Sequence, residues 1–155
     1  MAIERLRAGR PTSLRIDGSS MEPLLVAGQM VSIEPCRPED LRMGDLVAFE
    51  RDARVILHRV LRRSRGTGEV TEKGDNAALP TRVAPSRVLG RATMRLDPPR
   101  PLRPGPWIAR LSSLHGAIHA SLGRIAERYP RSRLAVLLRL LDGSLRTVRR
   151  LAARS

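Results

Sequence analysis

A proline-rich stretch divides this chain and limits it to one ordinary domain with an appendage. Residues 97–106 (DPPRPLRPGP) contain five prolines and no hydrophobic periodicity. Proline lacks the N–H that helices and strands use, so we predict a semi-rigid, extended linker here. The 155 residues then leave room for one domain at 1–96 and a shorter tail at 107–155.

The segment before the linker has the pattern of a β domain. Short apolar runs recur, and clusters of Gly, Pro, Asp and Ser separate them. Gly90 interrupts the last run and predicts a bulge or a close backbone approach. The spacing indicates a mainly β fold with a compact, barrel-like core. The expected strands cover residues 14–16, 31–33, 46–49, 55–61 and 88–96, with a hairpin connection at 51–54.

After the linker the apolar period changes to that of a helix. Apolar residues recur at steps of three and four from Trp107 to Ile125, and again from Leu134 to Val148. We therefore predict a C-terminal α-helical extension with arginines opposite its second stripe. This pattern suits packing on the domain or on a partner helix, and equally suits peripheral contact with an anionic membrane.

The charge of the chain restricts its partners. The net charge is +14, and the segment 101–155 contributes 11 arginines against two acidic residues. A basic tail favours an anionic surface. With one Trp, one Tyr and one Phe, the chain cannot build the stacking platform of a single-stranded nucleic-acid binder, so nucleic acid is not an expected partner.

The sequence contains no recognisable targeting or membrane-spanning segment. The N-terminal residues are basic and lack an apolar run. The longest stretch of the tail without formal charge, 111–123, is 13 residues, whereas a bilayer crossing needs roughly 18–20. We expect a cytoplasmic or membrane-peripheral protein.

The segment GSSMEP (18–23) is suited to presenting a serine nucleophile. A serine hydroxyl needs a neighbouring base and an oxyanion stabiliser. Gly18 allows a sharp turn after a strand, and Pro23 stiffens the exit, so Ser20 can be held beside backbone N–H groups. Taken alone, the six residues equally describe an ordinary serine-rich turn.

His58 is the candidate general base. Strand alternation places it on one face with Ile56 and Val60, where the imidazole would be partly desolvated. Such a histidine can be a structural core residue, but a partly desolvated imidazole also suits base catalysis near neutral pH.

The segment TEKGDN (71–76) predicts a tight turn. Its Asp75 could orient an imidazole, or simply belong to a surface turn. Lys73 is the only lysine of the chain, so it is the one candidate for a lysine base in a Ser20–Lys73 dyad.

Taken in order, these segments resemble the S24/S26 peptidase superfamily, which contains signal peptidases and LexA-like self-cleaving proteins. The resemblance covers roughly residues 14–96. The matching segments are GSSMEP (18–23), Gly28, GDLVAF (44–49), HRV (58–60), KGDN (73–76) and Gly90.

The resemblance implies a serine endopeptidase that cleaves an extended peptide or precursor protein after a small residue, without a cofactor or metal. Ser20 falls on the nucleophile, and its N–H on one oxyanion donor. Asp75 falls on the aspartate of the Gly-Asp segment. His58 stands where most bacterial members have lysine, which is similar to the endoplasmic-reticulum, archaeal and SipW-like branch. Substrate would add as a strand along the 14–16 edge, with Leu14, Ile16 and Met21 as substrate-binding residues.

The chain also departs from the family pattern. Members of the histidine branch often carry a second acidic residue shortly after the Gly-Asp segment, but residues 77–81 (AALPT) contain none. That absence favours an alternative, a non-catalytic peptidase-fold binding module that works through its basic helical tail. A LexA-like repressor fits less well, because nothing before residue 14 predicts a helix-turn-helix. His115 and His119 lack a third ligand nearby, so a metal site is not expected.

Overall fold

The computed structural model describes residues 1–77, 79–102, 105, 107, 110 and 114. The predicted helical extension, apart from three of its positions, lies outside these residues. Among the residues that are described, no helix is long and apolar enough to cross a bilayer.

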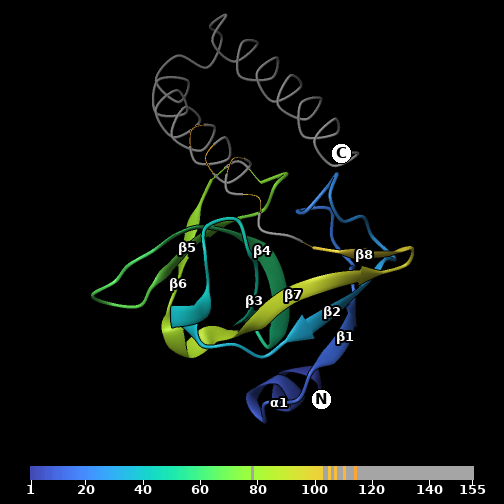
Figure 1. Cartoon of the computed structure of the whole chain (residues 1–155), viewed down its shortest axis with the longest axis horizontal. Helices are drawn as coiled ribbons and strands as arrows, with labels where there is room; N and C mark the ends of the chain where they lie inside the picture. Colours follow the sequence, from blue (N-terminus) through green and yellow to red (C-terminus); the bar gives the residue numbers. More distant parts are fainter. Residues whose placement is uncertain (78, 103–104, 106, 108–109, 111–113, 115–155) are drawn as a thin grey trace, which may run out of the picture.

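Eight strands form one curled, half-barrel sheet with little helix (Figure 1), which confirms the mainly β prediction. All neighbouring strands are antiparallel, in the order β1-β2-β7-β3-β4-β5-β6, with β8 paired to β7. The strands are β1 (Thr12–Arg15), β2 (Met30–Glu34), β3 (Leu46–Arg51), β4 (Arg54–Arg63), β5 (Val70–Lys73), β6 (Thr81–Val83), β7 (Val88–Leu96) and β8 (Pro99–Pro101). Helix α1 covers Ala2–Arg7, and short 3-10 turns cover Pro38–Asp40 and Pro85–Arg87.

Strand β7 joins two halves of the sheet. It lies between β2 and β3, so the β1–β2 hairpin and the β3–β6 strands share a sheet only through it (Figure 1). Gly90 makes this junction possible, because a Cβ there would lie 2.3 Å from the Glu34 carbonyl oxygen. The register also shifts between Ala48 and Phe49, opposite this part of β7. Both observations confirm the prediction for Gly90.

The core consists of two apolar clusters on opposite faces of the central strands. Leu46 and Ala48 of β3 contribute to one cluster, and the alternating Val47 and Phe49 contribute to the other. Because all four side chains are buried, β3 has apolar residues on both faces. This explains the continuous apolar run LVAF in the sequence.

Four elements were not predicted. Strand β5 carries the charged residues of TEK, strand β6 has three residues, and β8 lies in the proline-rich segment, where it extends β7 by pairing with its end. Helix α1 is short, and it attaches to the domain through Leu6, which is 2% exposed. The segment 71–76 is therefore the end of a strand followed by a turn, rather than a turn throughout.

Candidate active site

The serine loop is fixed by the opposite half of the sheet. Ser20 follows β1, and its carbonyl oxygen accepts a hydrogen bond of 2.7 Å from the Asn76 N–H. The Asn76 side-chain amide donates to the Ser19 carbonyl oxygen at 3.3 Å. The turn after β5 thus holds the backbone on both sides of the Ser20 nitrogen. Within the described residues, the Ser20 N–H donates to no protein acceptor, so it is available to an oxyanion.

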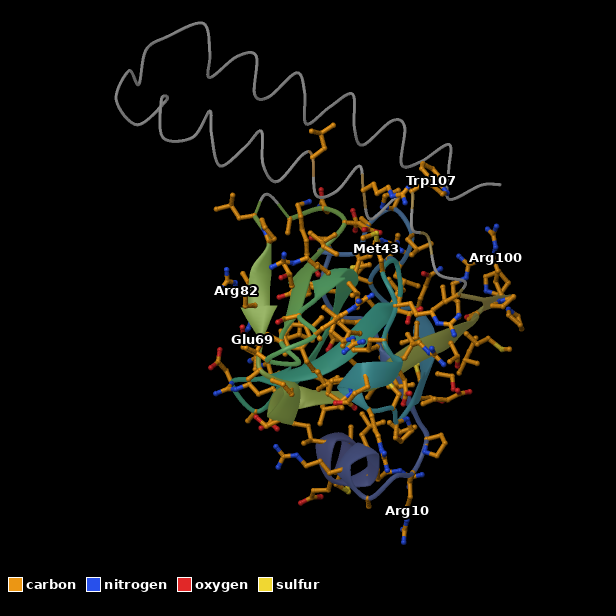
Figure 2. The ribbon with its side chains drawn as sticks, turned by 60° about the vertical axis from the view of Figure 1, so that its left-hand side comes forward. Arg10, Met43, Glu69, Arg82, Arg100 and Trp107 are labelled. Carbon is orange, nitrogen blue, oxygen red and sulfur yellow. The ribbon has the colours of Figure 1, made fainter. Side chains whose placement is uncertain are left out.

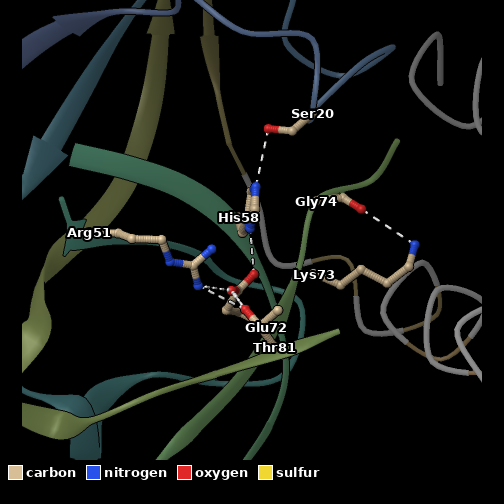
Figure 3. Close-up of polar contacts among 7 residues, drawn as sticks. All are labelled: Ser20, Arg51, His58, Glu72, Lys73, Gly74 and Thr81. Carbon is tan, nitrogen blue, oxygen red and sulfur yellow. Dashed lines mark hydrogen bonds and ion pairs between the residues drawn. The ribbon is translucent and has the colours of Figure 1, made fainter. Parts of the chain in front are cut away.

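The His58 imidazole meets the Ser20 hydroxyl. Its Nε2 lies 3.1 Å from Ser20 Oγ, which is hydrogen-bond distance (Figure 3). The histidine side chain is 13% exposed, and Phe49 packs edge-on against the ring at 5.9 Å between centroids. The two residues that the sequence proposes as nucleophile and base are therefore brought together.

Glu72 lies on the other side of the imidazole. Its Oε2 is 2.5 Å from His58 Nδ1, and its Oε1 accepts hydrogen bonds from Arg51, at 3.1 Å, and from the Thr81 hydroxyl. A carboxylate at Nδ1 keeps the proton on that nitrogen, which leaves Nε2 as the acceptor for the serine proton. Ser20, His58 and Glu72 form one continuous line of contacts (Figure 3).

The environment keeps Glu72 ionised. Burial raises the pKa of this carboxyl, but the hydrogen bonds from His58 and Thr81 and the charges of His58 and Arg51 together outweigh it. The pKa of Glu72 consequently lies below its ordinary value. An ionised carboxylate can stabilise the imidazolium that forms during acyl transfer.

Asp75 is not at His58. Both of its oxygens bind the buried Arg59, at 2.8 Å to Nε and 2.7 Å to an Nη, and Arg59 also donates to the Gly44 carbonyl oxygen. Contrary to the expectation from the sequence, Asp75 therefore does not contact the imidazole, and Glu72 occupies the position beside His58 Nδ1.

A β-bulge is the physical reason. Arg62 pairs with Thr71 and Arg63 with Val70, and this register, continued along β4, would put Asp75 opposite His58. The register shifts between Val60 and Arg62, and one residue of slip moves every side chain to the other face. Glu72 consequently shares a face with His58, whereas Asp75 does not.

Gly74 lets the turn after β5 approach Ser20 and His58 closely. A Cβ at this position would lie 2.7 Å from the Ser20 carbonyl oxygen, 3.0 Å from Ser20 Cβ and 3.1 Å from His58 Nε2. Only a residue without a side chain permits this approach.

Lys73 lies on the face opposite Glu72. Its side chain is fully buried and points away from Ser20 (Figure 3), and its Nζ donates to the Gly74 carbonyl oxygen at 3.4 Å. The Ser20–Lys73 dyad therefore has no contact in its favour within the described part of the chain.

A groove of about 780 Å³ leads away from Ser20. Leu14, Ile16 and Met21, the three expected substrate-binding residues, all line it. One wall is formed by the end of β1, which pairs only with β2, and by the residues that follow it up to Gly18. The other is formed by residues 54–57 of β4, which precede the pairing of β4 with β5 at Arg59, and residues 1–3 also line the groove. Both walls thus present strand edges without a partner among the described residues, as strand addition requires.

Comparison with known families agrees with this geometry. A family model described as Peptidase S24-like matches residues 6–93, more than half of the chain. The chain belongs to the S24-like peptidase family. Members of this family are generally serine peptidases, which supports a protease. Searches among curated proteins and among solved structures gave no significant match.

Glu72 is the residue that sequence reasoning missed. The one signal available was its position within TEK, next to the Gly-Asp segment, but its face depends on the bulge in β4. For the S24-like peptidase described here, the carboxylate at the histidine thus comes from the strand before the Gly-Asp segment, not from the residues after it.

Proposed function

We propose that this protein is a serine endopeptidase in which Ser20 is the nucleophile, His58 the general base and Glu72 the residue that positions the histidine. The proposal is carried by the unbroken line of contacts from Ser20 Oγ through the imidazole to the buried carboxylate, with distances of 3.1 Å and 2.5 Å. This geometry is what an activated serine requires.

The reaction follows from the positions of these groups. Ser20 Oγ attacks the substrate carbonyl carbon, and its proton passes to His58 Nε2. The negative charge forms on the carbonyl oxygen, beside the Ser20 N–H, while Glu72 stabilises the imidazolium. His58 then gives its proton to the leaving amine, and an acyl-enzyme remains. A water molecule, deprotonated by His58, attacks this ester and releases the carboxylic acid and free Ser20.

The substrate that fits is an extended peptide, such as a segment of a precursor protein. Its backbone would add as a strand in the groove, and Met21, 2% exposed beside the nucleophile, favours a small residue before the scissile bond. This matches the signal-peptidase type of cleavage.

The alternative of a non-catalytic binding module drew its support from the missing acidic residue at 77–81. Glu72 supplies a carboxylate to His58 from a different position, which weakens that support.

The decisive experiment compares the wild type with Ser20→Ala and His58→Ala on peptides with alanine before the scissile bond. Both variants should lose cleavage while their circular dichroism stays that of the folded wild type. An acylating serine probe should label the wild type at Ser20 and not the Ser20→Ala form. Lys73→Met should retain activity. An inactive Lys73→Met together with an active His58→Ala would instead support the Ser20–Lys73 dyad.

A further inference from the structure

The β1 wall of the groove has an apolar side and a charged side. Leu14 and Ile16 are half-buried and pack against the core cluster that contains Val31 and Leu25. Arg15 and Asp17, which alternate with them, are exposed and also line the groove. A strand laid along β1 would present its side chains alternately to these two sides.

The β4 wall carries one exposed charge at its far end. Val55 and Leu57 pack against the same core cluster as Leu14 and Ile16, Ile56 packs against the second cluster, and Arg54 is exposed. By strand alternation Arg54 belongs to the face of Ile56 and His58. Arg15 and Arg54 thus stand on opposite walls of the groove.

Neither arginine is neutralised by the protein. Arg15 and Arg54 form no ion pair with any residue that the structure describes, although other arginines of this domain do, such as Arg7 with Glu50 and Arg51 with Glu72. The two guanidinium groups are therefore available to a substrate carboxylate.

Along the chain, the negative charge of Asp17 lies nearer to Ser20 than the positive charge of Arg15 does. Asp17 is three residues before Ser20, and Arg15, the last residue of β1, is five residues before it. Arg54 lies four residues before His58 on β4. We take it that a peptide extended along the groove from Ser20 meets Asp17 first, with its second residue before the scissile bond, and then Arg15 and Arg54, with its fourth.

We infer that the groove selects peptides with Asp or Glu four residues before the scissile bond and disfavours an acid two residues before it. This inference rests on the proposed function, because it assumes that the peptide lies along β1 with its cleavage site at Ser20.

Binding to the full-length Ser20→Ala variant tests the selection without requiring cleavage. Fluorescein-labelled peptides would carry alanine at the first and third residues before the bond and Glu, Gln or Lys at the fourth. The Glu peptide should bind about tenfold more tightly than the Lys peptide at low ionic strength. The difference should shrink in 1 M salt, where the screening length is about 3 Å.

Charge reversal identifies the residues responsible. Arg15→Glu with Arg54→Glu, added to Ser20→Ala, should invert the preference from Glu to Lys. Arg82→Glu is the matched control, because this exposed arginine is on β6, at the opposite edge of the sheet from β1 (Figure 2). Moving the glutamate from the fourth to the second position should remove its advantage.

The outcomes separate this inference from the proposed function. Equal affinity for the Glu and Lys peptides, including no measurable affinity for either, would overturn the selection, as would a preference that persists after charge reversal. Wild-type protein that cleaves both peptides equally would retain the proposed function and lose the selection. Charge-dependent binding without cleavage of any peptide by the wild type would reject the catalytic role, and the two arginines would then select an acidic residue of a bound peptide with no position relative to a scissile bond.

Discussion

Each face of the β4–β5 pair carries one buried carboxylate, and the two carboxylates have different roles. On one face Glu72 binds His58, and on the other Asp75 binds Arg59. Both carboxylates are buried, but the first has a partner that can accept and release a proton and that reaches Ser20. Arg59 is 1% exposed and contacts Asp75 and the Gly44 carbonyl, so we assign this ion pair a structural role. The comparison shows that the role of each buried carboxylate depends on its binding partner and on the face of the sheet that it occupies.

The structural face supports the chemical one. Arg59 ties Asp75 to the carbonyl of Gly44, at the entry to β3. The turn fixed in this way presents Gly74 and Asn76 to the Ser20 loop. Substitutions on the His58 face should mainly lower the rate of cleavage, whereas substitutions on the Arg59 face should mainly lower the free energy of unfolding.

The largest effect is expected for Glu72→Gln. An amide cannot hold the proton on Nδ1 in the same way or stabilise the imidazolium, so kcat should fall by about 10³–10⁴-fold. The rate of cleavage of an alanine-containing peptide measures this, with urea unfolding as the control for folding. A variant with wild-type kcat would remove Glu72 from the proposed machinery.

Asp75→Asn should act on stability instead. It leaves the buried Arg59 without its counter-charge, which should cost about 3 kcal/mol of the free energy of unfolding. Urea unfolding measures the loss, and the folded fraction should keep kcat within severalfold of wild type. Arg7→Gln breaks the exposed pair with Glu50 and should change stability by less than about 1 kcal/mol. A collapse of kcat in folded Asp75→Asn would contradict the division between the faces.

Gly74→Ala should loosen the contact between the chemical partners. Its Cβ would press on Ser20 and on His58 Nε2, at 3.0 Å and 3.1 Å, and so displace the hydroxyl from the base. A displacement on the order of 1 Å can cost about 100-fold in rate. Gly66→Ala is the matched control, because its Cβ would meet nothing within 4 Å and Gly66 does not line the groove. Equal rates for the two variants would show that the close approach has no catalytic importance.

The smallest effect concerns acid. The pKa of Glu72 is lowered in the folded protein, so its stabilising contribution is present above the ordinary value of 4.5 and is lost as the pH falls through the folded pKa. The free energy of unfolding should be measured at pH 7 and again in the acid range below 4.5. Its decrease between these two conditions should be larger for the wild type than for Glu72→Gln. An equal fall in both proteins would show that Glu72 is not held ionised by its partners.

Much of the fold and the chemical pair could be predicted from the sequence. Apolar alternation and turn residues locate the long strands, which depend on local pattern. The pairing of Ser20 with His58 is expected from the resemblance to the S24/S26 peptidases, and the two side chains lie at hydrogen-bond distance.

The identity of the carboxylate at His58 could not be predicted in the same way. It depends on the register of β5 against β4, and a bulge between Val60 and Arg62 changes that register by one residue. Nothing in the apolar pattern marks the bulge. Strand β5 itself was missed because Glu72 and Lys73 are charged and yet almost fully buried, and only their partners in the folded protein make this burial tolerable.

The place of β7 in the sheet bears on when the candidate active site can assemble during synthesis. Ser20 belongs to the hairpin made first, while His58 and Glu72 belong to strands made later, and the strand that connects them is made after both. A nascent chain that has not yet emerged past residue 96 holds a hydroxyl and an imidazole on separate hairpins without a common sheet. Translation order would thereby leave the arrangement of Ser20, His58 and Glu72 without its connecting strand until residue 96 has been made.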